Sequence, residues 1–215
     1  QSAAAAIVKL VDLREERLDE LDLSRPIAAF SLALAALSYS PDVDHVAPPT
    51  SKTLAQAMKD LQVREADVAK LVATVAKTHM LDPGYAAEIV QAAKKYEKKI
   101  FPRAEDIIAL VGIESRFKPK AKSKLKNDPA VGLTQVRPKI WKIPAEELHT
   151  IDGSIKHGVA ILDAYYQKLG TPEAALQAYN LGITRYRKAT SDAKAAGERY
   201  LNKFNKERAL YPKTT

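Results

Sequence analysis

The stretch that decides the fold is residues 103–115, Arg-Ala-Glu-Asp-Ile-Ile-Ala-Leu-Val-Gly-Ile-Glu-Ser. Its apolar side chains recur at the spacing i, i+3, i+4 and i+7, namely Ala104, Ile107, Ile108 and Val111. This spacing predicts a helix with one face in a core, and the next residue on that face is Glu114. A carboxyl on a core-facing stripe loses hydration, which raises its pKa and lets it hold a proton near neutral pH. Glu114 is therefore a candidate general acid, unless the helix ends there and turns the side chain to solvent.

Helical periodicity continues on both sides of this stretch. The expected helices cover residues 4–21, 27–37, 51–61, 64–79, 85–99 and 172–179, with a final helix around Tyr200. Only 8 glycines are present, and β-branched runs are few, which argues against an all-β or doubly wound fold. We therefore predict an all-α protein.

The two halves of the chain differ in charge. Residues 1–80 carry a net charge of −2 and residues 81–215 a net charge of +10. Asp82-Pro83-Gly84 is a break between them. We expect residues 1–81 to be a helical companion region, able to bind a protein partner, and residues 82–215 to be the catalytic domain. The basic half should meet an anionic partner, such as a nucleic acid, a membrane surface or a wall polymer.

Several classes of site and segment are not expected. The chain has no cysteine, which excludes disulfides and thiol nucleophiles, and its 4 histidines show no metal-ligand spacing. We therefore predict no metal site and no cofactor. The longest mainly apolar run, residues 27–39, is shorter than the about 20 residues that a membrane-spanning helix needs. A transmembrane segment is therefore not expected.

Four short motifs follow one another in the second half of the chain. They are Glu114-Ser115, Gly132-Leu133-Thr134-Gln135, Ala178-Tyr179-Asn180-Leu181-Gly182 and Glu198-Arg199-Tyr200-Leu201. Their order and spacing resemble the catalytic domain of soluble-type (SLT) lytic transglycosylases, which has a lysozyme-like helical fold. The sequence departs from that family at Thr134, where the family has Met, at Leu181-Gly182-Ile183, where it has Ala-Gly-Pro, and in a longer loop over residues 124–131.

The resemblance implies a reaction and a set of site residues. Glu114 would protonate the β-1,4 glycosidic oxygen between N-acetylmuramic acid and N-acetylglucosamine in peptidoglycan. It would then accept the proton of the sugar's C6 hydroxyl, which closes a 1,6-anhydro ring. The family pattern places substrate contacts at Ser115, Gly132, Leu133, Gln135, Tyr179, Asn180 and Tyr200, and Tyr200 is also expected to orient the carboxyl.

Alternatives remain open for several of these residues. Ser115 could instead bond the helix backbone, and Tyr200 could be a plain core tyrosine. A hydrolytic lysozyme or endolysin of related fold would need a second carboxylate, for which Asp128 and Asp152 are the nearby candidates. The alternating basic residues from Arg116 to Lys126 could attract an anionic wall or simply be a solvated loop.

The expected partner is the peptidoglycan glycan strand rather than a nucleic acid, because no helix-turn-helix signature or aromatic stacking series is present. The resemblance implies action in the periplasm or cell envelope of a bacterium, or on the host wall if the protein is phage-encoded. A role as a phage-particle or secretion-apparatus component with local wall-degrading activity is compatible with this reading. On the motifs alone, residues 83–215 are expected to retain some activity.

Overall fold

A computed structural model describes residues 51–213, so the helices expected over 4–21 and 27–37 lie outside the described residues. Its elements, in chain order, are α3 (Ser51–His79), α4 (Pro83–Tyr96), α5 (Ala104–Ser115), α6 (Pro138–Trp141), α7 (Ala145–Leu148), α8 (Ile151–Leu169), α9 (Pro172–Leu181), α10 (Ile183–Lys188) and α11 (Ser191–Arg208). Between residues 51 and 213 regular structure is helical, and β-pairing is limited to isolated bridges of Val131 with Lys122 and with Val136. The prediction of an all-α fold is confirmed for this part of the chain.

The segment predicted as two helices, 51–61 and 64–79, is the single helix α3. Gln62 and Val63, which separate the two predicted helices, include no glycine or proline. A helix continues through such residues because neither the missing N–H of proline nor the low helix propensity of glycine interrupts it. One face of the last third of α3 is buried, since Leu71 and Val75 are fully enclosed in the main core.

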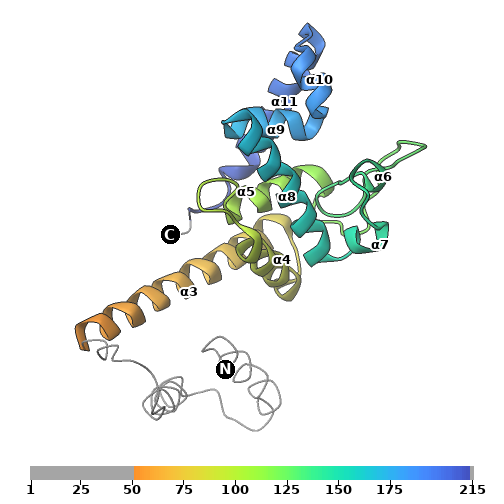
Figure 1. Ribbon diagram of the computed structural model, residues 1–215. Helices are drawn as coiled ribbons and strands as arrows, with labels where there is room; N and C mark the ends of the chain where they lie inside the picture. The colour runs from red at the N-terminus through yellow and green to blue at the C-terminus, as the bar shows by residue number, and fades with distance from the viewer. Residues whose placement is uncertain (1–50, 214–215) are drawn as a thin grey trace, which may run out of the picture. The chain divides into compact units, whose positions relative to one another are not determined.

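Helix α5 packs against α4 and α11, as Figure 1 shows. Eight of its residues besides Ser115 are buried, from Ala104 to Gly112 with the exception of Asp106. The core around α5 draws on α3, α4, α8, α9 and α11, through side chains such as Leu71, Ile89, Leu162, Leu176 and Phe204. A helix so enclosed holds the residues at its end in a fixed place.

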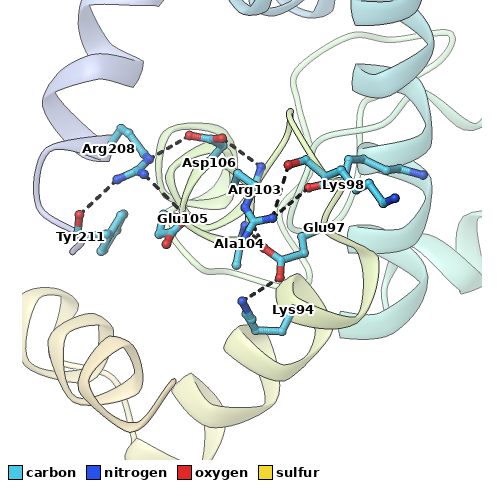
Figure 2. Close-up of polar contacts among 10 residues, drawn as sticks. Lys94, Glu97, Lys98, Arg103, Ala104, Glu105, Asp106, Arg208 and Tyr211 are labelled. Atoms are coloured by element: carbon cyan, nitrogen blue, oxygen red, sulfur yellow. Dashed lines mark hydrogen bonds and ion pairs between the residues drawn. The ribbon is translucent and has the colours of Figure 1, made fainter. Parts of the chain in front are cut away.

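The beginning of α5 is fixed by ion pairs and backbone bonds, drawn in Figure 2. The Asp106 carboxylate accepts a hydrogen bond from the Arg103 N–H at 2.9 Å and lies 2.8 Å from Nε of Arg208. The Glu97 carboxylate accepts from the Ala104 N–H at 3.0 Å. Carboxylates at this end also suit the helix dipole, because the first N–H groups of a helix have no intrahelical partner.

Two further findings concern the boundaries of the chain's parts. The chain from Lys52 onward forms one compact unit. Residue 81 is not marked by a break in packing, because Leu71 and Val75 belong to the same core as Ile107 and Leu110. The assignment of residues 1–81 as a companion region therefore stays a prediction. Among residues 51–213, no helix is long and apolar enough to cross a membrane.

Candidate active site

Glu114 lies in the last turn of α5, which continues to Ser115. Its side chain is half-buried rather than turned out to solvent. Burial raises the pKa of the carboxyl from 4.5 to about 7, and a hydrogen bond from Tyr200 opposes part of that rise. A carboxylic acid with a pKa near the working pH can both give and take a proton, as a general acid and base must.

Tyr200 comes from α11, 86 residues further along the chain, and its hydroxyl donates to Oε1 of Glu114 at 2.6 Å. This bond fixes the orientation of the carboxyl and favours its ionised form. Burial is the main cause of a strongly raised pKa at Tyr200, and the charge of Glu114 adds to it. The tyrosine therefore keeps its proton and remains a donor throughout the physiological pH range.

Tyr179 is the second tyrosine near the acid. Its hydroxyl donates to the carbonyl oxygen of Thr134 at 2.7 Å, which ties α9 to the Gly132–Gln135 motif. Burial raises its pKa, and the charge of Glu114 raises it further. Of the three other motifs, one bonds Glu114 through Tyr200, one lies within range of its charge through Tyr179, and the third is joined to Tyr179 through Thr134.

The first two residues of the second motif, Gly132 and Leu133, are buried in the loop that carries Gln135. Gly132 is buried with φ +79°, and a Cβ there would collide with the carbonyl oxygen of Leu148. Leu133 is fully buried in the main core. Gly132 is thus needed for its backbone conformation and close packing, and the Leu133 side chain cannot reach a substrate. The assignment of Gly132 and Leu133 as substrate contacts stays a prediction, and it is their backbone that would have to make such contacts.

Thr134, the departure from the family at this motif, is also enclosed. Its hydroxyl donates to the Ser154 carbonyl at 2.7 Å, and its N–H donates to the Ser154 hydroxyl at 3.1 Å. The Thr134 hydroxyl thus bonds the carbonyl of Ser154 and lies 3.1 Å from its hydroxyl, so it is hydrogen-bonded although it is buried. The substitution is therefore accounted for by packing against α8.

Gln135 holds the loop with its amide nitrogen. Nε2 donates to the carbonyl oxygens of Gly132 at 2.9 Å and Ala121 at 3.2 Å, and the residue has a left-handed φ of 52°. The side chain is half-buried. Its carbonyl Oε1 is consequently the group that it could offer to an acetamido N–H or a sugar hydroxyl.

The two remaining residues that were predicted to contact substrate are Ser115 and Asn180. Ser115 is buried and its hydroxyl donates to the Val111 carbonyl at 3.1 Å, which is the alternative that the sequence left open. Asn180 is exposed, one residue after Tyr179 on α9. Asn180 is the more accessible of the two to a bound glycan.

Neither candidate for a second carboxylate is suited to that role. Asp128 is buried, accepts from the backbone N–H groups of Lys139 at 3.0 Å and Ile140 at 3.3 Å, and so caps α6. Asp152 is exposed and accepts from Lys95 at 2.8 Å and Tyr96 at 2.7 Å. Its pKa is lowered mainly by the Lys95 hydrogen bond. Both carboxylates therefore have structural partners.

Residues that the motifs did not indicate also contact the site. Tyr85 of α4 donates to the Phe117 carbonyl at 2.7 Å, in the turn directly after Glu114 and Ser115. Tyr165 of α8 raises the pKa of Tyr179 and contacts the ring of Trp141, with the ring centroids 6.0 Å apart. The sequence carries no local signal for either, because each lies on a helix whose pattern is that of an ordinary core helix.

Comparison with models of protein families assigns the chain to a family. The model of the transglycosylase SLT domain matches residues 91–202, just over half of the chain. This chain belongs to the SLT transglycosylase family, whose domain acts on peptidoglycan. Comparisons with curated proteins and with solved structures find no match.

The raised pKa of Glu114 has a consequence for stability. The pKa is about 7 in the folded chain against 4.5 unperturbed. The contribution of the protonated Glu114 carboxyl to the free energy of unfolding is therefore fully present below pH 4.5 and is lost as the pH rises through about 7. We expect Glu114→Gln, which is neutral at every pH, to be more stable than the wild type at pH 8 by roughly 1–3 kcal/mol. Urea unfolding measures this, and an equal gain at pH 4 and pH 8 would contradict it.

Proposed function

We propose that this protein is a lytic transglycosylase that cleaves the bond between N-acetylmuramic acid and N-acetylglucosamine in peptidoglycan. Glu114 acts first as acid and then as base, and the product carries a 1,6-anhydro ring. The single observation that carries the proposal is the half-buried Glu114 carboxyl, with a pKa raised to about 7 and a 2.6 Å bond from Tyr200.

The reaction needs one carboxyl in two protonation states. Protonated Glu114 delivers its proton to the glycosidic oxygen as the bond breaks, and the muramic N-acetyl group stabilises the oxocarbenium-like carbon. The ionised carboxylate, held by Tyr200, then accepts the proton of the C6 hydroxyl while the C6 oxygen bonds to the anomeric carbon. Because a pKa near 7 leaves both forms accessible at neutral pH, neither step requires a large change in the site.

The residues around Glu114 can orient a glycan. We propose that Oε1 of Gln135, the exposed Asn180 and the ring of Tyr179 contact the sugars, and that Gly132 and Leu133 maintain the loop which carries Gln135. The side chains of Arg116, Lys118, Lys120, Lys122, Lys124 and Lys126 are all exposed. Their positive charge would attract the carboxylates of peptidoglycan stem peptides. Action in the cell envelope, or on a host wall for a phage-encoded protein, is the setting that this substrate implies.

The product distinguishes the proposed lyase from a hydrolytic lysozyme. We expect purified peptidoglycan digested in ¹⁸O-labelled water to yield anhydro-muropeptides without the label, measured by mass spectrometry. Reducing ends that carry ¹⁸O would instead show that water attacks the anomeric carbon. Asp152→Asn serves as the matched control, because a hydrolase that used this carboxylate would lose about 10²-fold or more of its activity, whereas the lyase should keep most of it.

A further inference from the structure

The turn that follows Glu114 has an unusual backbone. Arg116 and Phe117 are successive non-glycine residues with left-handed φ values of 53° and 60°. Such conformations persist only where the surroundings hold them. The Phe117 carbonyl accepts a hydrogen bond from the Tyr85 hydroxyl. The ring of Phe117 is buried against the ring of His79, with the centroids 4.4 Å apart. His79, the last residue of α3, thus supports the end of the helix that carries Glu114.

The other edge of the His79 ring contacts the far end of α11. Nε2 lies 2.7 Å from the Tyr211 hydroxyl oxygen and 3.1 Å from Oε1 of Glu207. The Tyr211 hydroxyl donates to the same Glu207 oxygen at 2.5 Å, so the histidine nitrogen is the donor to Tyr211. The Glu207 carboxylate in turn lies against α5, where a Cβ at Gly112 would collide with it.

Glu207 lies on the same face of α11 as Tyr200, and Tyr211 follows in the bend after the helix. The residues on this face, at spacings of four and three, are Ala193, Gly197, Tyr200, Phe204 and Glu207. Side chains at these spacings share one side of a helix. Holding Glu207 and Tyr211 therefore fixes the rotation of α11 about its axis, and with it the position of the Tyr200 hydroxyl. Arg208 adds an anchor to Asp106 at 2.8 Å (Figure 2).

We propose that His79 is a positioning residue for the Glu114–Tyr200 pair, because it joins the turn that ends α5 to the end of α11. This inference rests on the proposed function for its catalytic meaning. His79, Glu207 and Tyr211 all lie outside residues 91–202, the part of the chain that matches the SLT domain. The support that we propose for Glu114 therefore comes from residues beyond the matched range.

Few titratable groups lie around His79 and around Glu114. Facing His79 are Glu207 of α11 and Tyr211 of the turn after it, while Phe117 contributes an uncharged ring. Near Glu114, the Tyr200 hydroxyl of α11 lowers the pKa of the carboxyl, and the charge of Glu114 in turn raises the pKa of Tyr200 and of Tyr179 of α9. The Tyr200 bond lowers the pKa of Glu114, against the larger rise that burial causes. Loss of that bond in a carboxyl that stays buried should therefore raise the pKa further.

The test titrates Glu114 directly in the full-length chain, by ¹³C NMR of its side-chain carboxyl. We compare the wild type with His79→Ala, His79→Gln, Tyr200→Phe and the double variant His79→Ala/Tyr200→Phe. We expect His79→Ala and Tyr200→Phe each to raise the pKa of Glu114 by about one unit, and the double variant to raise it no further than Tyr200→Phe. Gln can donate a hydrogen bond from a similar position, so His79→Gln should stay close to the wild type.

A kinetic arm measures kcat and KM on soluble glycan strands at pH 5.5, where Glu114 is protonated in every variant. We expect His79→Ala to lose about tenfold in kcat, the cost of a misplaced group, with KM little changed. A wild-type pKa and kcat in a folded but less stable His79→Ala variant would overturn the proposal. So would additive pKa shifts in the double variant, or equal defects in His79→Gln and His79→Ala.

The test gives a result even if one variant does not fold or the wild type does not cleave peptidoglycan. If His79→Ala does not fold, Tyr211→Phe replaces it, because it keeps the ring and removes only the hydroxyl that His79 contacts. A raised pKa of Glu114 in that variant supports the proposal, and an unchanged one overturns it. If the wild type does not cleave peptidoglycan, the proposed function fails, but the NMR titration still decides whether His79 positions the pair.

Discussion

Glu114→Gln is expected to leave the fold intact and to abolish cleavage of peptidoglycan. The amide keeps the volume of the side chain and can still accept the Tyr200 hydrogen bond, but it has no proton to deliver to the glycosidic oxygen. A single general acid contributes about 10²–10⁴-fold to such a rate. Release of soluble muropeptides from purified peptidoglycan measures the loss, and circular dichroism confirms the fold.

The matched control is Glu198→Gln, which makes the same substitution in the motif that contains Tyr200. Glu198 is exposed on α11, so its charge is solvated and its removal should change the rate little. Clearing by Glu114→Gln at the wild-type rate would remove Glu114 from its assigned role. Equal losses in both variants would show that charge on this surface, rather than proton transfer, limits the reaction.

The location of the acid could be predicted from a local pattern. The stripe Ala104, Ile107, Ile108 and Val111 gave both the helix and the face on which Glu114 lies, because one helical period relates them. The surroundings of Glu114 are different, since Tyr200 bonds it, and Tyr179 lies within range of its charge, from helices more than 60 residues away in sequence. Only the resemblance to a family, and not the physics of spacing, could indicate them beforehand.

Other details were beyond sequence reasoning for identifiable physical causes. The hydroxyl of Ser115 could bond either a substrate or the Val111 carbonyl, and only the folded helix decides. Leu133 was expected at the substrate, but tertiary packing encloses it completely. His79 is the last residue of an amphipathic helix and precedes a chain break, and nothing in that pattern indicates Phe117, Glu207 or Tyr211 as its neighbours.

The packing of α3 also changes the expectation for shortened chains. The motifs alone suggested that residues 83–215 retain some activity, since all four lie there. That fragment lacks Leu71 and Val75, both fully buried, and it lacks His79. Their loss removes two enclosed side chains from the main core and the His79 contacts with Phe117, Glu207 and Tyr211. Each large apolar side chain removed from a core costs about 2–5 kcal/mol. Two such losses approach the whole stability of an ordinary domain.

We therefore expect residues 52–215 to unfold cooperatively and to cleave peptidoglycan, and residues 83–215 to be unfolded or nearly inactive. Urea titration followed by circular dichroism, and muropeptide release, measure the two properties on the same preparations. A third fragment, residues 64–215, keeps Leu71, Val75 and His79 while it lacks the first part of α3. This fragment should behave like 52–215, because Val63 is exposed and the buried part of the helix begins later. Full activity of a well-folded 83–215 fragment would show that α3 is a companion to the catalytic domain and not a part of its core.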